Sequence, residues 1–276
     1  MINSLSRLLA LTLCASLALG FVARADEAAE KGRTIFTQNC KAVVTVQVVV
    51  KVSSGRSSNT GESKTDLTGT VVDPSGLTVV ALSSCDPSDL YRLMNEGAKI
   101  DVEVTDVKIL LEDGTELPAE IVLRDHDLDL AFLRPKIKPA APMASIDLTK
   151  SSPAQVLDQS VTLNRLNRAA GRAYSASVER ISAVISKPRT FYIPDSMMST
   201  TTSGSPAFML DGNVLGIFVL RAVSAAGGSG NGRDGVTAII LPASDVLKAA
   251  RQAPEAKGED EKKDTAKPAA ETKDDK

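Results

Sequence analysis

The chain is poor in the residue types that most often carry chemistry. Its 276 residues include one histidine, no tryptophan, three cysteines and 3% aromatic residues, and 32 Lys+Arg stand against 34 Asp+Glu. Without a basic excess or aromatic platforms for bases, we expect no binding to nucleic acid. The shortage of histidine and cysteine disfavours a four-ligand zinc site, and we expect no metal and no cofactor. Because acid–base chemistry near neutral pH most often uses histidine, the position of His126 matters.

The N-terminus has the pattern of a secretory signal peptide. Arg7 precedes an apolar run, Leu8–Val22, and an Ala-Arg-Ala sequence that ends at residue 25 offers a cleavage site. Residues 1–25 are therefore predicted to be removed on export to the periplasm or the extracellular space, with only transient membrane contact. An uncleaved anchor is the alternative, although the run is shorter than the ~20 residues of a spanning helix.

Export would place the two remaining cysteines, Cys40 and Cys85, in an oxidising compartment. A disulfide between them is permitted there, but no sequence feature shows that their backbones approach. A bridge and two free thiols both stay open. Cys40 ends a short N-terminal segment, residues 26–41, that precedes the folded body.

The C-terminal 23 residues, 254–276, differ in composition from the rest. They contain six Lys, eight Asp/Glu and no apolar side chain larger than Ala. Such a segment cannot bury enough apolar surface to offset its ordering entropy, so a disordered tail is predicted. A partner-binding tail is the alternative. The folded body is then expected over residues 42–253.

The body is built of short β-branched runs separated by turns. A polar Ser/Gly/Asn stretch, Ser53–Asp66, predicts a loop. Helices are predicted only at Pro87–Glu96 and Ser244–Gln252. Closely spaced strands with few helices indicate an all-β sandwich or barrel, and two half-sized units, about 42–140 and about 155–250, fit two barrels. The predicted strands are 42–52, 69–73, 77–82, 102–111, 119–123, 130–133, 160–166, 173–184, 206–209, 214–220 and 236–241.

Three segments, in this order, resemble trypsin-like serine proteases of the HtrA/Deg type. Gly69–Cys85 is similar to the hairpin that leads into the catalytic histidine, Val107–Leu133 to the stretch that ends at the triad aspartate, and Thr201–Ile217 to the nucleophile motif. The resemblance implies two antiparallel β-barrels with the active cleft between them and a short C-terminal helix. We expect the C-terminal peptide-binding domain of the family to be absent.

The resemblance places the triad aspartate at Asp129 and the nucleophile at Ser203, but it finds no histidine. The histidine position falls on Ser83 or Ser84, depending on a one-residue shift in register. A serine hydroxyl is a very weak base near pH 7, whereas the mechanism needs an imidazole that takes up and returns a proton. Ser203 therefore lacks an evident activator, and a turn serine is its alternative role.

The oxyanion hole that the resemblance implies, at Thr201, Thr202 and Ser203, is also altered. The family has glycine where this chain has Thr201, and again where it has Ser205. A β-branched residue resists the backbone conformation that glycine adopts easily, so the hole is expected to be collapsed or reshaped.

Residues near Asp129 offer two further roles. His126 could act as a substitute base, but it precedes Asp129 in a turn, so a solvated histidine is predicted. The alternation of Asp125, Asp127 and Asp129 resembles the start of a calcium loop, yet the glycine and distal glutamate of that loop are absent. Without a histidine to orient, Asp129 is expected to bond nearby backbone amides.

These observations predict an exported, proteolytically inactive trypsin-like protein. Its cleft is expected to bind an extended peptide or an envelope protein, because strand addition requires no triad. The alternative is a serine endopeptidase or hydrolase in which Ser203 is activated by an unconventional base, His126 or a lysine. A third reading is an interaction module tethered by its charged tail.

Overall fold

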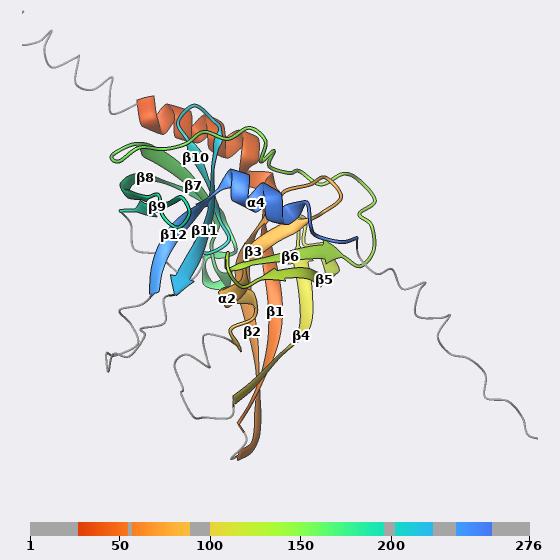
Figure 1. The fold of residues 1–276 in the computed structure, drawn as a ribbon. Coiled ribbons are helices and arrows are strands. Elements are labelled where there is room, and N and C mark those ends of the chain that lie inside the picture. The colour runs from red at the N-terminus through yellow and green to blue at the C-terminus, as the bar shows by residue number, and fades with distance from the viewer. Residues whose placement is uncertain (1–26, 55–56, 89–99, 196–201, 223–235, 256–276) are drawn as a thin grey trace, which may run out of the picture.

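Two closed six-stranded β-barrels make up most of the molecule. The structure, a computed structural model, describes residues 27–54, 57–88, 100–195, 202–222 and 236–255 (Figure 1). All neighbouring strands within the barrels are antiparallel, and both barrels have the same strand order, 1-2-3-6-5-4 counted within each barrel. The predicted all-β class, with two antiparallel barrels and a short C-terminal helix, is confirmed.

The strand bounds follow the β-branched runs closely. Barrel 1 contains β1 (Val43–Ser54), β2 (Ser57–Val71), β3 (Thr78–Ala81), β4 (Ile100–Leu110), β5 (Glu116–Asp125) and β6 (Leu130–Pro135). Barrel 2 contains β7 (Gln159–Arg165), β8 (Tyr174–Ile185), β9 (Phe191–Pro194), β10 (Pro206–Met209), β11 (Val214–Ala222) and β12 (Val236–Pro242). The short strand β9 was not predicted, because four residues between two prolines give little periodicity.

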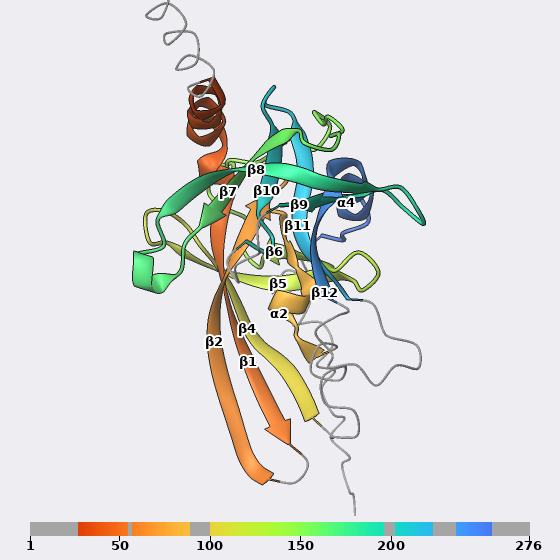
Figure 2. The same cartoon turned by 90° about the vertical axis from the view of Figure 1, so that its left-hand side faces the viewer.

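The loop predicted over Ser53–Asp66 is wrong, since most of it belongs to β2. Val48 pairs with Thr65 and Val52 with Gly61, so the β1–β2 ladder continues far beyond the barrel. Strand pairing uses backbone groups, and a ribbon that leaves the barrel can carry polar side chains. In Figure 2, β1, β2 and β4 extend together as this ribbon.

Two helices lie near the ends of the described chain, and one short helix follows β3. The C-terminal helix α4 (Ala243–Ala250) matches its prediction, and α2 (Leu82–Cys85) is a single turn. Most of the helix predicted at Pro87–Glu96 lies outside the described residues. The 3₁₀ turns are η1 (Cys40–Ala42) and η2 (Arg168–Ala170). No helix in the described ranges is long and apolar enough to span a bilayer.

A helix over residues 27–39 was not predicted. Glu27 and Lys31 form an i,i+4 ion pair of 3.0 Å on its surface. Ile35 is 3% exposed, and a Cβ added at Gly32 would sit 3.7 Å from a methyl of Val161. An alanine would make only ordinary contact at Gly32, so burial of Ile35 is the packing that offsets the low helix propensity of this glycine.

Three apolar clusters organise the interior. One fills barrel 1, another fills barrel 2, and the largest lies between the barrels and under the helices. The rest of the inter-barrel contact is polar. Arg172 Nε donates to Asp66 Oδ2 over 2.7 Å, and Thr68 Oγ1 donates to Asn164 Oδ1 over 3.2 Å. Apolar packing and cross-barrel hydrogen bonds together hold the two barrels in a fixed arrangement.

Candidate functional site

Asp129 lies at the junction of the two barrels and joins them through its carboxylate. Oδ1 accepts the backbone N–H of Ser83 over 2.7 Å, and Oδ2 accepts the Ser83 hydroxyl and the backbone N–H of Leu220, both over 2.9 Å. Its own carbonyl accepts the N–H of Leu82 over 2.9 Å. Asp129 also has a positive φ of 55°, which these contacts stabilise.

The two serines that the sequence offered for the histidine position differ in their contact with Asp129. Ser83 bonds the aspartate with both its amide and its hydroxyl, whereas no hydrogen bond joins Ser84 to Asp129. Ser83, and not Ser84, is therefore the serine of this pair that contacts the carboxylate. A hydroxyl there can donate to the carboxylate, but it cannot store a proton as an imidazole does.

Burial sets the electrostatics of Asp129. Removal from water raises the pKa of the carboxyl to about 6, against the opposing effect of the hydrogen bonds from Ser83 and Leu220 and of the charge on His126. The hydrogen bonds recover only part of the hydration that the ionised carboxylate has lost.

Ser203 lies in a tight turn immediately before β10. It is 2% exposed, and its hydroxyl oxygen is buried with no hydrogen-bond partner in the described structure. No imidazole and no lysine amine therefore bonds this hydroxyl in the described chain. A nucleophile needs a base within hydrogen-bond reach and an open path to its substrate, and the described Ser203 has neither.

Gly204 joins the same turn to both barrels through hydrogen bonds of its backbone groups. Its N–H donates to the carbonyl of Phe218 over 2.8 Å, and its carbonyl accepts the hydroxyl of Thr70 over 2.8 Å. Its φ is +89°, and an added Cβ would lie 2.2 Å from the carbonyl oxygen of Thr68. Only glycine fits this position, because both the backbone conformation and the space exclude a side chain.

Strand β11 brings the two sequence-predicted residues near each other. The turn that holds Ser203 binds β11 at Phe218, and Asp129 binds the same strand at Leu220. These anchor points are two residues apart, or about 7 Å along a strand. The structure thus gathers Ser83, Asp129 and the Ser203 turn on one side of the barrel interface.

The residues of the oxyanion position are only partly described. Thr201 lies outside the described residues. Thr202 is 8% exposed, and its hydroxyl accepts a long hydrogen bond of 3.5 Å from Asn164. Neither Thr202 nor Ser203 has a positive φ, and Ser205 donates its hydroxyl to Asn164 over 2.6 Å. Ser205, which stands where the resemblance predicts a glycine, is thus hydrogen-bonded within barrel 2.

His126 and its acidic neighbours take part in a surface turn. His126 is exposed, and Asp125 accepts the backbone N–H groups of Asp127 and Leu128 over 3.1 and 3.0 Å. Asp127 forms an ion pair with Arg189. No group of three His, Cys, Asp or Glu side chains is placed to hold a metal ion in the described part of the chain.

The two cysteines are free thiols in the structure. Cys85 is buried inside barrel 1, where loss of hydration raises the pKa of its thiol to about 12. Cys40 is half-buried after the N-terminal helix. A raised pKa removes the reactive thiolate, so Cys85 acts as a core residue.

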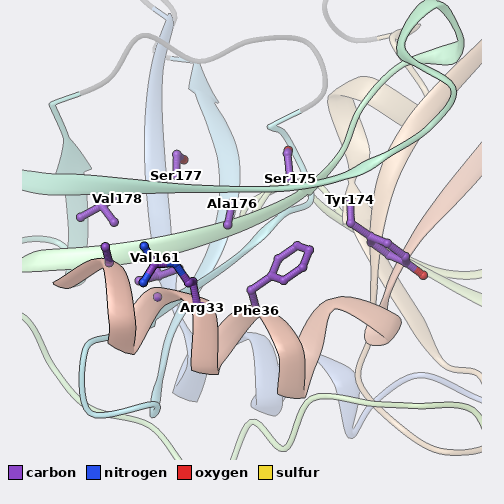
Figure 3. Close-up of a pocket in the computed structure, with 10 residues that line it drawn as sticks. Arg33, Phe36, Val161, Tyr174, Ser175, Ala176, Ser177 and Val178 are labelled. Carbon is purple, nitrogen blue, oxygen red and sulfur yellow. The ribbon is translucent and has the colours of Figure 1, made fainter. Parts of the chain in front are cut away.

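Two grooves lie away from the Asp129 site. The first, of about 370 Å³, separates the N-terminal helix from β7 and β8 (Figure 3). Its lining includes Phe36, Val161, Tyr174 and Val178, and the ring of Phe36 meets that of Tyr174 edge-on at 6.5 Å. The second, of about 580 Å³, lies between barrel 1 and the connection that contains residues 139–144.

Comparison with known families agrees with the fold. A family model described as trypsin-like peptidase domain matches residues 20–217, which is more than half of the chain. The protein therefore belongs to the trypsin-like peptidase family. The matched span contains Ser83, Asp129 and Ser203 but ends before Leu220. No protein of curated function matches the sequence.

Sequence reasoning did not identify two contacts that shape this site. The backbone N–H of Leu220 binds Asp129, and the hydroxyl of Thr70 binds the carbonyl of Gly204. Any residue at position 220 would supply that amide, so it carries no sequence signal. Thr70 belongs to a β-branched run in which only the strand register distinguishes it from its neighbours.

Proposed function

We propose that this protein is a proteolytically inactive, HtrA/Deg-type member of its family that serves as a binding or scaffolding module for extended peptides or proteins. The observation that carries the proposal is the hydrogen bonding of Asp129. Its carboxylate is bound by Ser83 and Leu220, with no imidazole between it and Ser203.

The chemistry of these groups supports inactivity. Acyl transfer by serine needs a base that accepts the hydroxyl proton and later protonates the leaving group. Ser83 has no basic site of the required strength, and Ser203 is buried without a partner among the described residues. Hydrolysis by Ser203 with an unconventional base is the competing function, and it lacks a base bonded to that hydroxyl.

Peptide binding is supported by the groove beside β8. The backbone N–H and C=O of Arg180 form hydrogen bonds with Asp195 on one edge of β8. The N–H and C=O of Ile181 form theirs on the opposite edge, with Asp158 and Leu157. Because successive residues of a strand direct their backbone groups to opposite edges, the backbone groups of Val178 point to the same edge as those of Arg180, where Asp195 lies. No described strand pairs with this edge before Arg180, so an extended peptide added there would place alternate side chains in the groove.

Export is part of the proposal. The apolar run that precedes residue 26 and the small residues at its end are the features of a cleaved signal peptide, and they assign the mature protein to the periplasm or the extracellular space. A peptide or unfolded segment of an envelope protein is then the partner class that the protein would meet.

A peptide library tests binding and inactivity together. Extended peptides incubated with the purified protein should be retained and recovered intact by mass spectrometry. The variant Val178→Asp should lose retention, because it puts a charge into the apolar groove. Ile185→Asp, at an exposed position of β8 outside the groove lining, is the matched control. Cleaved peptides, or equal retention by both variants, would contradict the proposal.

A further inference from the structure

Barrel 2 contains a cluster of buried oxygen atoms that lack partners. Four buried side-chain atoms without a hydrogen bond occur in the described residues, and three of them lie on β7 and β8. They are Ser160 Oγ, Thr162 Oγ1 and Glu179 Oε2. Their residues are 0%, 1% and 8% exposed. Buried polar atoms are normally hydrogen-bonded, so three orphans in one place require an explanation.

The strand register brings these atoms to one face. Ser160 lies directly opposite Glu179, and Thr162 lies opposite Ser177. Opposed side chains have their Cβ atoms about 4.5–5.5 Å apart. The other carboxylate oxygen of Glu179 accepts the hydroxyl of Ser177 over 2.9 Å. One oxygen of the carboxylate is thus held, and the other has no hydrogen-bond partner among the described residues.

This face points into the barrel. Thr162 pairs directly with Ala207, and Glu179 stands two residues before Ile181, so each shares a sheet face with that residue. Ala207 and Ile181 belong to the apolar cluster inside barrel 2. Figure 3 shows Ser177 directed away from the N-terminal helix, whereas Val178 lies on the helix side.

A carboxylate oxygen beside an apolar cluster needs a positive partner. An ionised acid loses several kcal/mol of hydration on burial unless a cation or hydrogen bonds replace it. No lysine or arginine of the described residues forms an ion pair with Glu179. A ligand that combines positive charge with several hydrogen-bond donors would satisfy all three oxygen atoms.

We propose that barrel 2 holds an interior site for a protonated primary amine, bound by Glu179, Ser160 and Thr162. An ammonium group has three N–H donors and no acceptor, which matches three unpartnered oxygen atoms. A divalent metal fits less well, because only one carboxylate is present and such ions prefer several. Ser177 is exposed although it bonds Glu179, so the amine enters beside Ser177. The amine is a free alkylamine or the side chain of a lysine.

Calorimetry and thermal unfolding with butylammonium chloride test the site in the purified protein. The amine should bind with measurable heat and raise the unfolding temperature, because a ligand of the folded state stabilises it. Sodium chloride at equal ionic strength should not do so. Glu179→Gln should weaken binding at least about tenfold, and Thr162→Val roughly fivefold. Glu103→Gln, at an exposed position of β4, is the matched control and should bind like the wild type.

Several results would overturn the proposal. These are the absence of binding heat, equal stabilisation by sodium chloride, and unchanged affinity in Glu179→Gln. The proposal would also be overturned if an experimental structure showed only a water molecule between the three oxygens and no amine bound. If Glu179→Gln does not fold, Thr162→Val and Ser160→Ala decide the question.

A second pair of ligands identifies the source of the amine. Acetyl-Ala-Ala-Lys-amide is compared with the same peptide carrying norleucine, which lacks the ammonium group. Selective binding of the lysine peptide assigns the site to peptide side chains, and binding of butylammonium alone assigns it to small amines. Either outcome supports the amine site, and neither depends on whether Ser203 is catalytically inactive.

Discussion

The hydroxyl of Ser83 donates a 2.9 Å hydrogen bond to Oδ2 of Asp129, the residue that the sequence resemblance predicts as the triad aspartate. The amide of the same serine donates to Oδ1 over 2.7 Å. Ser83 thus contacts this carboxylate through both its amide and its hydroxyl, and a hydroxyl cannot take up a proton as an imidazole does. This contact lies within barrel 1, whereas the N–H of Leu220, which bonds the same carboxylate, joins Asp129 to barrel 2.

Replacing Ser83 by alanine should lower the stability of the folded protein. The variant loses the hydroxyl bond and keeps the amide bond, so the free energy of unfolding should fall by about 1.5–3 kcal/mol, the range for a hydrogen bond to a charged group. Urea unfolding followed by circular dichroism measures this change. Ser84→Ala is the matched control, because no hydrogen bond joins Ser84 to Asp129, and it should change stability by less than about 0.5 kcal/mol. Equal effects of the two variants would refute the assignment of Ser83.

The titration of Asp129 should make the protein less stable as pH rises toward 6. Its pKa is about 6 in the folded protein and 3.8 in the reference state, so the folded protein binds more protons between these values. Its contribution is largest below pH 3.8 and is lost as pH rises through the folded pKa. The difference corresponds to about 3 kcal/mol at most.

Carbon-detected NMR of labelled aspartate measures this pKa directly. A carboxyl titration with a midpoint near 6 that disappears in Asp129→Asn is expected. A midpoint at or below the ordinary aspartate value would contradict the dominant role of burial.

Replacing Gly204 by alanine should be severely destabilising. The new Cβ would lie 2.2 Å from the carbonyl oxygen of Thr68 at a φ of +89°, so both backbone strain and overlap between the barrels follow. We expect a loss of about 3 kcal/mol or more in unfolding free energy. Gly212 has a φ of +87° but no atom within 4 Å of an added Cβ. Gly212→Ala should cost only about 1 kcal/mol, and denaturant unfolding of both variants separates strain from overlap.

The two serines on either side of Gly204 should respond in opposite ways. Ser203→Ala removes a buried hydroxyl without a partner, so stability should stay equal or rise by up to about 1 kcal/mol. Ser205→Ala breaks the 2.6 Å bond to Asn164 and should lower stability by about 1 kcal/mol or more. Thermal unfolding of the two variants checks this. A marked loss in Ser203→Ala would mean that its hydroxyl is bonded.

Much of the fold could be read from the sequence, because β-branched runs and turns mark most strands. The failures have physical causes. The polar residues at the start of β2 pair with β1 in the strand ladder, and the helix over residues 27–39 buries Ile35 in the apolar cluster that both barrels share. Tertiary contacts of this kind leave little trace in a local pattern.

The sequence predicts which residues form the candidate site, but it does not predict the hydrogen bonds that these residues make. Asp129 and Ser203 stand out through their motifs, whereas the choice between Ser83 and Ser84 required the three-dimensional turn of α2. The amide of Leu220 is the same whatever side chain it carries, so no sequence pattern could have revealed its bond to Asp129.

Labelling with a serine-directed fluorophosphonate tests the central claim most directly. The folded wild-type protein should show no label above that of Ser203→Ala, because Ser203 is buried and no base activates it. An active trypsin-like protease serves as the positive control for the probe. Clear labelling of the wild type that is lost in Ser203→Ala would show an activated nucleophile and would contradict the account.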